Sequence, residues 1–258
     1  MELAGGICRH LPLLAPDFSI DWQRLAELIN PRTRVIILNT PHNPSGTLLT
    51  REELDRLAEL VRHRDDLFIL SDEVYEHLVF DGREHVSVVS HDELYQRAFI
   101  VSSFGKTYHV TGWKTGYVVA PPVLMRELRK VHQYVRFAAV TPLQWALDEF
   151  MAAHPEHVDG LPAFYQAKRD LFCDLMEDSR FTFTRAAGTF FQVMDYSAIR
   201  PDLNDIEMAQ WLTREHGVAS IPVSVFYQTP PADQRLIRFC FAKQEHTLRE
   251  AAERLRAI

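Results

Sequence analysis

Four short apolar runs in the first half of the chain constrain its fold most. They occupy residues 35–38, 67–70, 98–101 and 117–120, and polar residues or prolines follow each one. Runs of four apolar residues without polar alternation are typical of strands buried on both faces of a sheet. Segments with helical periodicity lie between the first runs, as in parallel sheets whose strands are joined by helices. We therefore expect an α/β fold with a mostly parallel sheet.

The segment between the first two runs carries a helix start signal. Thr50 precedes Glu53 by three residues, which is the spacing of a capping box. Apolar residues then recur at helical spacing through residues 54–61, and residues 21–30 show the same periodicity before the first run. Both segments are expected to be helices that alternate with the strands.

The second half of the chain has a different pattern. Helices are expected at residues 125–135, 143–150, 161–176, 206–215 and 245–258, and strand-like segments at 181–185, 190–194, 218–221 and 236–242. This mixture predicts a smaller α+β domain. We place the boundary near residue 150, so that residues 1–150 form a large domain and residues 151–258 a small one.

Composition excludes several classes of function. The net charge of −7 argues against non-specific binding to nucleic acid or to an anionic membrane. No apolar stretch reaches the roughly 18 residues of a membrane span, and the start lacks a signal-peptide pattern. The three cysteines form no CxxC pair, and the histidines show no metal-binding spacing. We therefore expect a cytoplasmic protein with no metal, no nucleic-acid partner and no membrane partner.

Polar residues follow the first three apolar runs, where ligands bind in parallel α/β sheets. Lys106 comes shortly after the third run, and a desolvated lysine amine is a nucleophile toward carbonyl groups. Asp72 ends the second run, and a partly buried carboxylate needs a positive or hydrogen-bonding partner. A pyridinium N–H would be such a partner, as in pyridoxal-phosphate sites. Tyr75, three residues on, is expected to reach the same site.

Two further residues are suited to a phosphate group. Ser103 offers a hydroxyl donor and Lys114 a positive charge. Each of these side chains alone would more often be solvated or structural, and residues 43–46 alone indicate only a turn. Their joint occurrence after successive strands favours a binding site.

Three blocks carry a resemblance to a known family. Residues 39–46, 71–76 and 102–117 resemble the signature blocks of class I/II aminotransferases of fold type I, in the same order and spacing. Within that family the chain is most similar to bacterial methionine aminotransferase and the kynurenine aminotransferase-like group. The resemblance implies the fold of the pyridoxal-phosphate transferases, pyridoxal 5′-phosphate as cofactor, and an amino acid and a 2-oxo acid as substrates.

The resemblance also implies roles for individual residues. Lys106 matches the lysine that bonds covalently to the cofactor and moves the substrate Cα proton. Asp72 matches the aspartate that keeps the pyridine nitrogen protonated. Tyr75 and Asn43 match residues that contact the cofactor O3′, and Asn43 also helps to orient the substrate.

The remaining matches concern the phosphate and the substrate carboxylate. Ser103 matches the phosphate-binding serine, and Lys114 stands where many relatives carry arginine. Lysine supplies charge without the bidentate fork of arginine, so the hold on the phosphate is expected to differ. Arg238 matches the arginine that binds the substrate α-carboxylate through two parallel hydrogen bonds.

The resemblance begins inside the family's large domain. We therefore expect the N-terminal part to be missing, including the helix N-terminus that holds the cofactor phosphate. This predicts that the chain on its own binds pyridoxal phosphate weakly. Family members are usually homodimers, which the resemblance implies here as well.

Three functions stay open at this point. The first is an aminotransferase acting on methionine or aromatic amino acids, which the apolar tone of Tyr108, Phe190, Phe191 and Phe226 favours. The second is a pyridoxal-phosphate-dependent C–S β-lyase. The third is a catalytically impaired fragment that keeps only the fold. The sequence does not name the amino donor or the acceptor.

Overall fold

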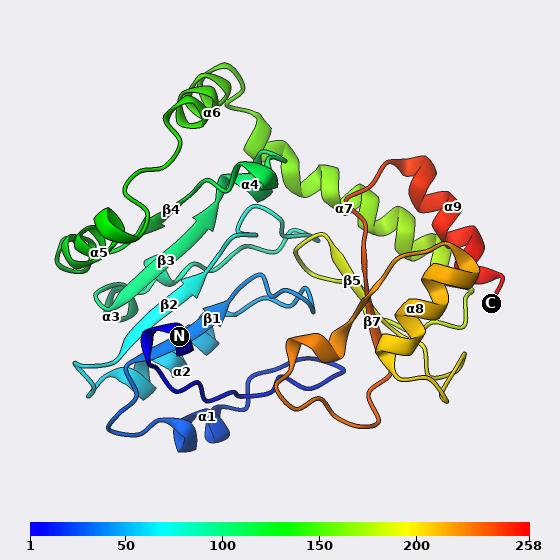
Figure 1. Cartoon of the computed structure of the whole chain (residues 1–258), viewed down its shortest axis with the longest axis horizontal. Coiled ribbons are helices and arrows are strands. Elements are labelled where there is room, and N and C mark those ends of the chain that lie inside the picture. Colours follow the sequence, from blue (N-terminus) through cyan, green and yellow to red (C-terminus); the bar gives the residue numbers. More distant parts are fainter. The chain divides into compact units, whose positions relative to one another are not determined.

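The computed structural model describes all 258 residues, and they form two compact units (Figure 1). We call them the four-stranded unit (Arg34–Ala167 and Ala187–Thr189) and the three-stranded unit (Met1–Thr33, Lys168–Ala186 and Phe190–Ile258). The division into a large domain of residues 1–150 and a small domain of residues 151–258 remains a prediction.

The four-stranded unit alternates strands with helices. Its strands are β1 (Val35–Asn39), β2 (Phe68–Asp72), β3 (Ala98–Ser103) and β4 (Gly116–Val119). Its helices are α2 (Arg51–Val61), η2 (Val88–Ser90), α3 (Asp92–Tyr95), α4 (Phe104–Thr107), η3 (Thr111–Trp113), α5 (Pro122–Val135) and α6 (Thr141–Ala153). Helix α7 (His157–Met176) begins in this unit and ends in the other.

The sheet of this unit has the strand order β1-β2-β3-β4. Strands β1, β2 and β3 are parallel, and β4 runs antiparallel to β3 at the edge. The prediction of a mostly parallel sheet is therefore confirmed. Asn39 pairs in register with Asp72, and Asp72 with Val101. The carboxyl ends of the three parallel strands therefore lie next to one another (Figure 1).

Burial of the sheet differs from the expectation in one respect. Ile36 and Leu38 of β1 are buried, whereas Ile37 between them is 50% exposed. Strand β4 is mostly exposed as well. The prediction that all four strands are buried on both faces is therefore wrong for β1 and β4, because one face of each outer strand is open to solvent. An apolar run shows that a strand forms, but it does not show what covers each face.

Helix α2 forms as the capping pattern predicts. The Thr50 side chain accepts from Glu53 N, and the Glu53 side chain accepts from Thr50 N, which satisfies two amide groups at the helix start. The apolar stripe buries Leu54, Leu57 and Val61 to 1% exposure or less. Complete burial of one such side chain stabilises the fold by about 1.5–3 kcal/mol. The stripe therefore fixes α2 on the sheet unit.

The three-stranded unit is an α+β arrangement. Its strands β5 (Phe191–Asp195), β7 (Leu236–Cys240) and β6 (Ile221–Pro222) lie in that order and pair antiparallel. Its helices are η1 (Glu2–Ala4), α1 (Trp22–Leu28), α8 (Asp205–His216), η4 (Val223–Phe226) and α9 (Glu245–Arg256). The prediction of a strand at residues 181–185 is wrong, because this segment forms no strand and has a single β-bridge, from Thr182 to Asp195.

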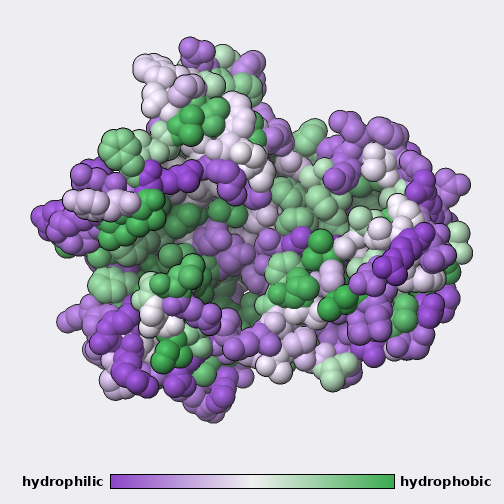
Figure 2. Space-filling model, in the orientation of Figure 1, coloured by the Kyte–Doolittle hydropathy of each residue, from purple (hydrophilic) through white to green (hydrophobic).

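Helices α5 and α6 leave apolar side chains at the surface. Tyr134 of α5 is 87% exposed, Phe137 between the two helices is 82% exposed, and Trp145 of α6 is 64% exposed. Figure 2 shows hydrophobic residues among hydrophilic ones over these helices. None of the helices combines the length and the apolar composition needed to cross a lipid bilayer.

Candidate active site

Asp72 ends β2 and is held there through its backbone. Its carbonyl oxygen accepts hydrogen bonds from Asn39 Nδ2 at 2.9 Å and from Thr40 N at 3.0 Å. Its carboxylate accepts from Val74 N at 3.3 Å. Burial raises the pKa of this half-buried carboxyl, while the Val74 N–H and the charge of Lys106 act in the opposite direction. Asp72 and Lys106 are therefore close enough to interact electrostatically.

Lys106 lies in α4, the single helical turn that follows β3. Its Nζ is 5.9 Å from the centroid of the Tyr75 ring. Ser103 begins the turn, and its hydroxyl accepts from Gly105 N at 3.2 Å. Tyr75 itself is 3% exposed. The amine, the carboxylate of Asp72 and the phenol therefore belong to one region beyond neighbouring strand ends.

The loop after Lys106 folds back tightly on the turn. Thr111 Oγ1 donates to Gly105 O at 3.0 Å. A Cβ atom at Gly105 would lie only 2.9 Å from the Thr111 Cα, so a larger residue would displace the backbone. This close approach fixes the position from which the Lys106 side chain extends.

Asn43 lies in the loop after β1 and is tied to the same strand ends. Its N–H donates to Asn39 Oδ1 at 2.8 Å. The neighbouring His42 is bonded through Nδ1 to Ser45 Oγ at 2.6 Å, and burial lowers the pKa of His42 to about 4. The loop is therefore held by neutral hydrogen bonds.

Lys114 ends η3, just before β4. Its backbone is in the left-handed region, with φ of 55°. Two residues later, Gly116 lies so close to β3 that an added Cβ would be 2.4 Å from Ser102 O. The glycine therefore allows the edge strand to begin directly beside the strand that leads to Lys106.

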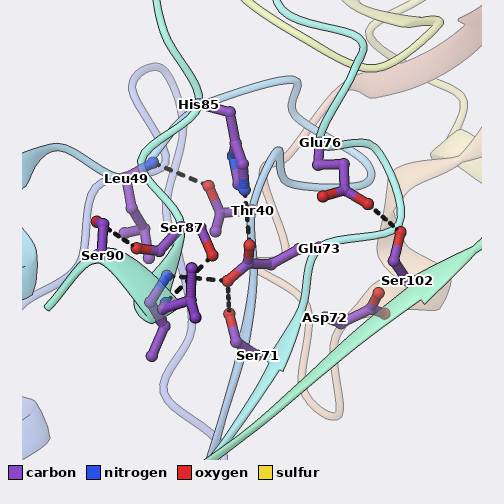
Figure 3. A network of polar contacts seen from close by, with 12 residues as sticks. Thr40, Leu49, Ser71, Asp72, Glu73, Glu76, His85, Ser87, Ser90 and Ser102 are labelled. Carbon is purple, nitrogen blue, oxygen red and sulfur yellow. Dashed lines mark hydrogen bonds and ion pairs between the residues drawn. The ribbon is translucent and has the colours of Figure 1, made fainter. Parts of the chain in front are cut away.

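Two clusters around this region went unnoticed in the sequence. Buried Glu73 is bonded to His85 Nε2 at 2.7 Å and to Ser71 Oγ at 2.8 Å (Figure 3). The Glu76 carboxylate accepts from the hydroxyls of Ser102 and Tyr117. Apart from Ser71, which is two residues from Glu73, these partners lie 12 to 41 residues away along the chain, so no local pattern could have identified them.

Arg238 belongs to the three-stranded unit, unlike the other six predicted site residues. It lies in the middle of β7, where it pairs with Val193 of β5 and Ile221 of β6. Its guanidinium carbon is 3.7 Å from the centroid of the Phe191 ring and 5.1 Å from that of Phe226. The arginine is therefore set among aromatic rings.

A lysine, an aspartate and a tyrosine beyond adjacent parallel strands are what the signature blocks imply, and comparison with known proteins decides the family. A family model described as aminotransferase class I and II matches residues 1–255. The chain belongs to this family. Its members depend on pyridoxal phosphate, so the recognition from sequence and the cofactor are both confirmed.

Relatives of the chain fall in the expected group. The methionine aminotransferase of Escherichia coli (strain K12) is 50% identical over 258 residues, which are 100% of this chain and 66% of that protein. The human kynurenine–oxoglutarate transaminase 3 is 35% identical over 258 residues, with 93% of this chain and 57% of that protein covered. The chain thus spans less than two thirds of the length of these curated relatives.

Solved structures confirm the fold. The crystal structure that identifies a methionine aminotransferase function in Escherichia coli has a TM-score of 0.95 at 50% identity, covering 99% of this chain and 67% of that one. The N-succinyldiaminopimelate aminotransferase of Mycobacterium tuberculosis has a TM-score of 0.91 at 32% identity, with the same coverage. The predicted fold type I architecture is therefore confirmed.

The donor set of the four-stranded unit fits pyridoxal phosphate. It offers an amine for the aldehyde (Lys106), an acid for the ring nitrogen (Asp72) and a phenol from Tyr75 in the same region. Ser103 opens the turn that carries the amine. Hydroxyl donors and ammonium groups are ordinary phosphate partners. The aldehyde, the ring nitrogen and the phosphate of the cofactor thus each have a candidate partner within this unit.

Proposed function

We propose that this protein is an aminotransferase that moves the amino group of an L-amino acid to a 2-oxo acid with pyridoxal phosphate. The observation that carries the proposal is that Asp72 and Lys106 follow the paired strands β2 and β3, close enough for the charge of Lys106 to act on the pKa of Asp72. Family membership and the named relatives support it.

The catalytic roles follow from the positions of these groups. Pyridoxal phosphate, when bound, supplies a carbonyl that condenses with amines and a ring that withdraws electrons from the substrate Cα. The Asp72 carboxylate holds a proton at the ring nitrogen, because an anion beside that nitrogen favours its charged form. The Lys106 amine would take a proton from the substrate Cα as a general base and give a proton back as a general acid.

Four other residues hold the cofactor in place. Tyr75 and Asn43 would contact O3′ of the bound cofactor, and the Asn39 bond to Asn43 N keeps that loop at the strand end. Ser103 and Lys114 bind the phosphate, one as a hydroxyl donor and the other as a charge. These roles rest on the family blocks and on the location of the residues around α4 and η3.

Arg238 binds the substrate carboxylate, and its surroundings favour an apolar amino acid. Two parallel hydrogen bonds from a guanidinium orient a carboxylate and so select the Cα bond that breaks. The rings of Phe191 and Phe226 lie against this guanidinium. Aromatic walls beside the carboxylate site suit methionine or an aromatic side chain better than a charged one.

We also propose that the protein works as a homodimer in the cytoplasm. The family resemblance supports the dimer, and so do the exposed apolar residues of α5 and α6, because monomers rarely expose large apolar patches. Analytical ultracentrifugation measures the oligomeric state directly, and a concentration-independent monomer would contradict the proposal.

Trapping the cofactor on its lysine tests the proposed function. The chain is mixed with an excess of pyridoxal phosphate and then reduced with borohydride. We expect peptide mass spectrometry to find the cofactor on Lys106. The Lys106→Ala variant should lose this label, while Lys168→Ala, altered on the other unit, should keep it.

Product analysis then separates the possible reactions. With methionine or an aromatic amino acid and a 2-oxo acid, a transferase forms a new amino acid and the matching oxo acid. A C–S β-lyase would release pyruvate and ammonia from a cysteine derivative. A labelled chain without either set of products would indicate a catalytically impaired fragment.

A further inference from the structure

Glu73 is a fully buried carboxylate directly after Asp72. Its Oε1 accepts from Ser71 Oγ at 2.8 Å and from Val88 N at 3.1 Å, and its Oε2 contacts His85 Nε2 at 2.7 Å. The residue is 0% exposed. A carboxylate is buried at this depth only when it is well paired, and this one is.

The hydrogen bonds keep Glu73 ionised. Burial acts to raise the pKa of Glu73, but bonds from the side chains of His85 and Ser87, with the Val88 N–H, outweigh it and lower that pKa. The group therefore carries a negative charge at neutral pH. Side-chain–backbone bonds to η2 also join the end of β2 to the segment that contains residues 85–90.

Strand geometry places this charge behind Asp72. Successive side chains of a strand point to opposite faces, so Asp72 and Glu73 diverge from one backbone. Figure 3 shows the Glu73 carboxylate turned toward His85 and Ser71 and the Asp72 carboxylate pointing elsewhere. The negative charge of Glu73 still acts on Asp72, where it contributes to raising the pKa.

The backbone of Glu73 also fixes the turn that carries Tyr75. Its N–H donates to Val101 O of β3 at 2.8 Å, and its carbonyl oxygen accepts from Glu76 N at 2.9 Å. The N–H, the carbonyl oxygen and the carboxylate of Glu73 are therefore all hydrogen-bonded. Asp72, directly before Glu73, and Tyr75, two residues after it, therefore have little freedom to move.

We propose that Glu73 is a positioning residue for the reaction, a fully buried carboxylate that fixes the end of β2 and adds negative charge behind the half-buried Asp72. The inference rests on the proposed function, because the benefit is to a bound pyridine ring. Two negative charges at the end of β2 would favour the protonated form of a bound pyridine ring more than one would. His85 and Ser71 keep the Glu73 carboxylate in place through their hydrogen bonds.

Titration of Asp72 in the chain without cofactor tests the proposal. Carboxyl-carbon NMR follows Asp72 in the unsubstituted chain, in Glu73→Gln and in the matched control Ser71→Ala. Glu73→Gln removes the charge and keeps the shape, so we expect the pKa of Asp72 to fall. Ser71→Ala removes one hydrogen bond and keeps the charge, so the pKa of Asp72 should stay near its original value.

A second measurement links this charge to the cofactor. Pyridoxal phosphate should bind Glu73→Gln several-fold more weakly than Ser71→Ala, and the absorbance of the bound cofactor should change its pH profile only in Glu73→Gln. An Asp72 titration that is the same in folded Glu73→Gln as in the unsubstituted chain would overturn the proposal.

Two outcomes need to be kept apart. If Glu73→Gln does not fold, carboxyl-carbon NMR of Glu73 in the unsubstituted chain is the deciding measurement. A neutral Glu73 at neutral pH overturns the proposal, and an ionised Glu73 supports it. If borohydride labels no lysine in the unsubstituted chain, the proposed function fails, whereas the Asp72 titration is measured without cofactor and stands by itself.

Discussion

Asn39 and Asp72 end two neighbouring parallel strands, and the Asn39 amide donates to the Asp72 carbonyl oxygen at 2.9 Å. The same side chain accepts from Asn43 N at 2.8 Å. One amide therefore connects the residue proposed to hold the ring nitrogen with the residue proposed to contact O3′. The resemblance implies no role for Asn39, yet this side chain links Asp72 and Asn43, which both have implied roles.

Replacing Asn39 by alanine should loosen this connection. The Asp72 carbonyl oxygen keeps its bond from Thr40 N, whereas the bond from Asn43 N to Asn39 is lost, and breaking a part-buried hydrogen bond of this kind costs about 1–3 kcal/mol. We expect Asn39→Ala to lower the free energy of unfolding by an amount in that range and to weaken pyridoxal phosphate binding. Denaturant titration and cofactor titration measure the two effects.

A stability control comes from the other unit. Asn204 caps α8 by accepting from Glu207 N, and its removal should cost about 1 kcal/mol. We expect Asn204→Ala to leave the cofactor affinity unchanged. Equal losses of affinity in both variants would show that Asn39 acts only through overall stability.

Arg238→Lys should affect carboxylate recognition specifically. Lysine keeps the charge but cannot form two parallel hydrogen bonds. Loss of one charge-assisted bond costs about 2 kcal/mol, so kcat/KM for the amino acid should fall about 30-fold. An amine donor without a carboxylate serves as control, since its rate should not change. A similar loss for both donors would remove Arg238 from carboxylate binding.

Acid should destabilise the protein through His42. Burial lowers the pKa of His42 from 6.5 to about 4, so the unfolded chain binds this proton first as the pH falls. The contribution of neutral His42 to the free energy of unfolding is therefore fully present above pH 6.5 and is lost as the pH falls toward 4. The loss from this group reaches at most about 3 kcal/mol.

Two variants separate His42 from other groups. Denaturant unfolding across this pH range should show a shallower decline in His42→Asn. His63 is exposed, so His63→Asn should keep the original decline. His77 and His109 also have lowered pKa values and should leave some dependence in both variants. An unchanged decline in His42→Asn would contradict the assignment.

A pair of glycine variants tests the approach of β4 to β3. An added Cβ at Gly116 would meet Ser102 O at 2.4 Å, and overpacking of this kind costs about 1–3 kcal/mol. Gly160 lies in α7 with nothing within 4 Å of the added atom, so Gly160→Ala should stabilise by about 0.5–1 kcal/mol. Thermal unfolding of both variants should show opposite shifts, and equal shifts would refute the close contact.

Local sequence patterns decided where many elements form. Thr50 and Glu53 are three residues apart, so their reciprocal bonds depend on one helical turn and could be predicted from the chain alone. The same holds for the strand ends at Asp72 and Lys106, because neighbouring parallel strands end at one edge of a sheet. The direction of β4 and the exposed face of β1 were not predictable, since an apolar run does not encode its neighbours.

Only the tertiary structure decided which polar groups meet. The Asn39 bond to Asp72 spans 33 residues and the Glu73 bond to His85 spans 12. Segment 181–185 has a strand-like pattern but forms a single bridge, because pairing depends on the partner as well as the pattern. The sequence by itself determined the family, the cofactor chemistry and most elements through short-range signals. Long-range hydrogen bonds come from chain folding, so the supporting residues around Asp72 appeared only in the folded molecule.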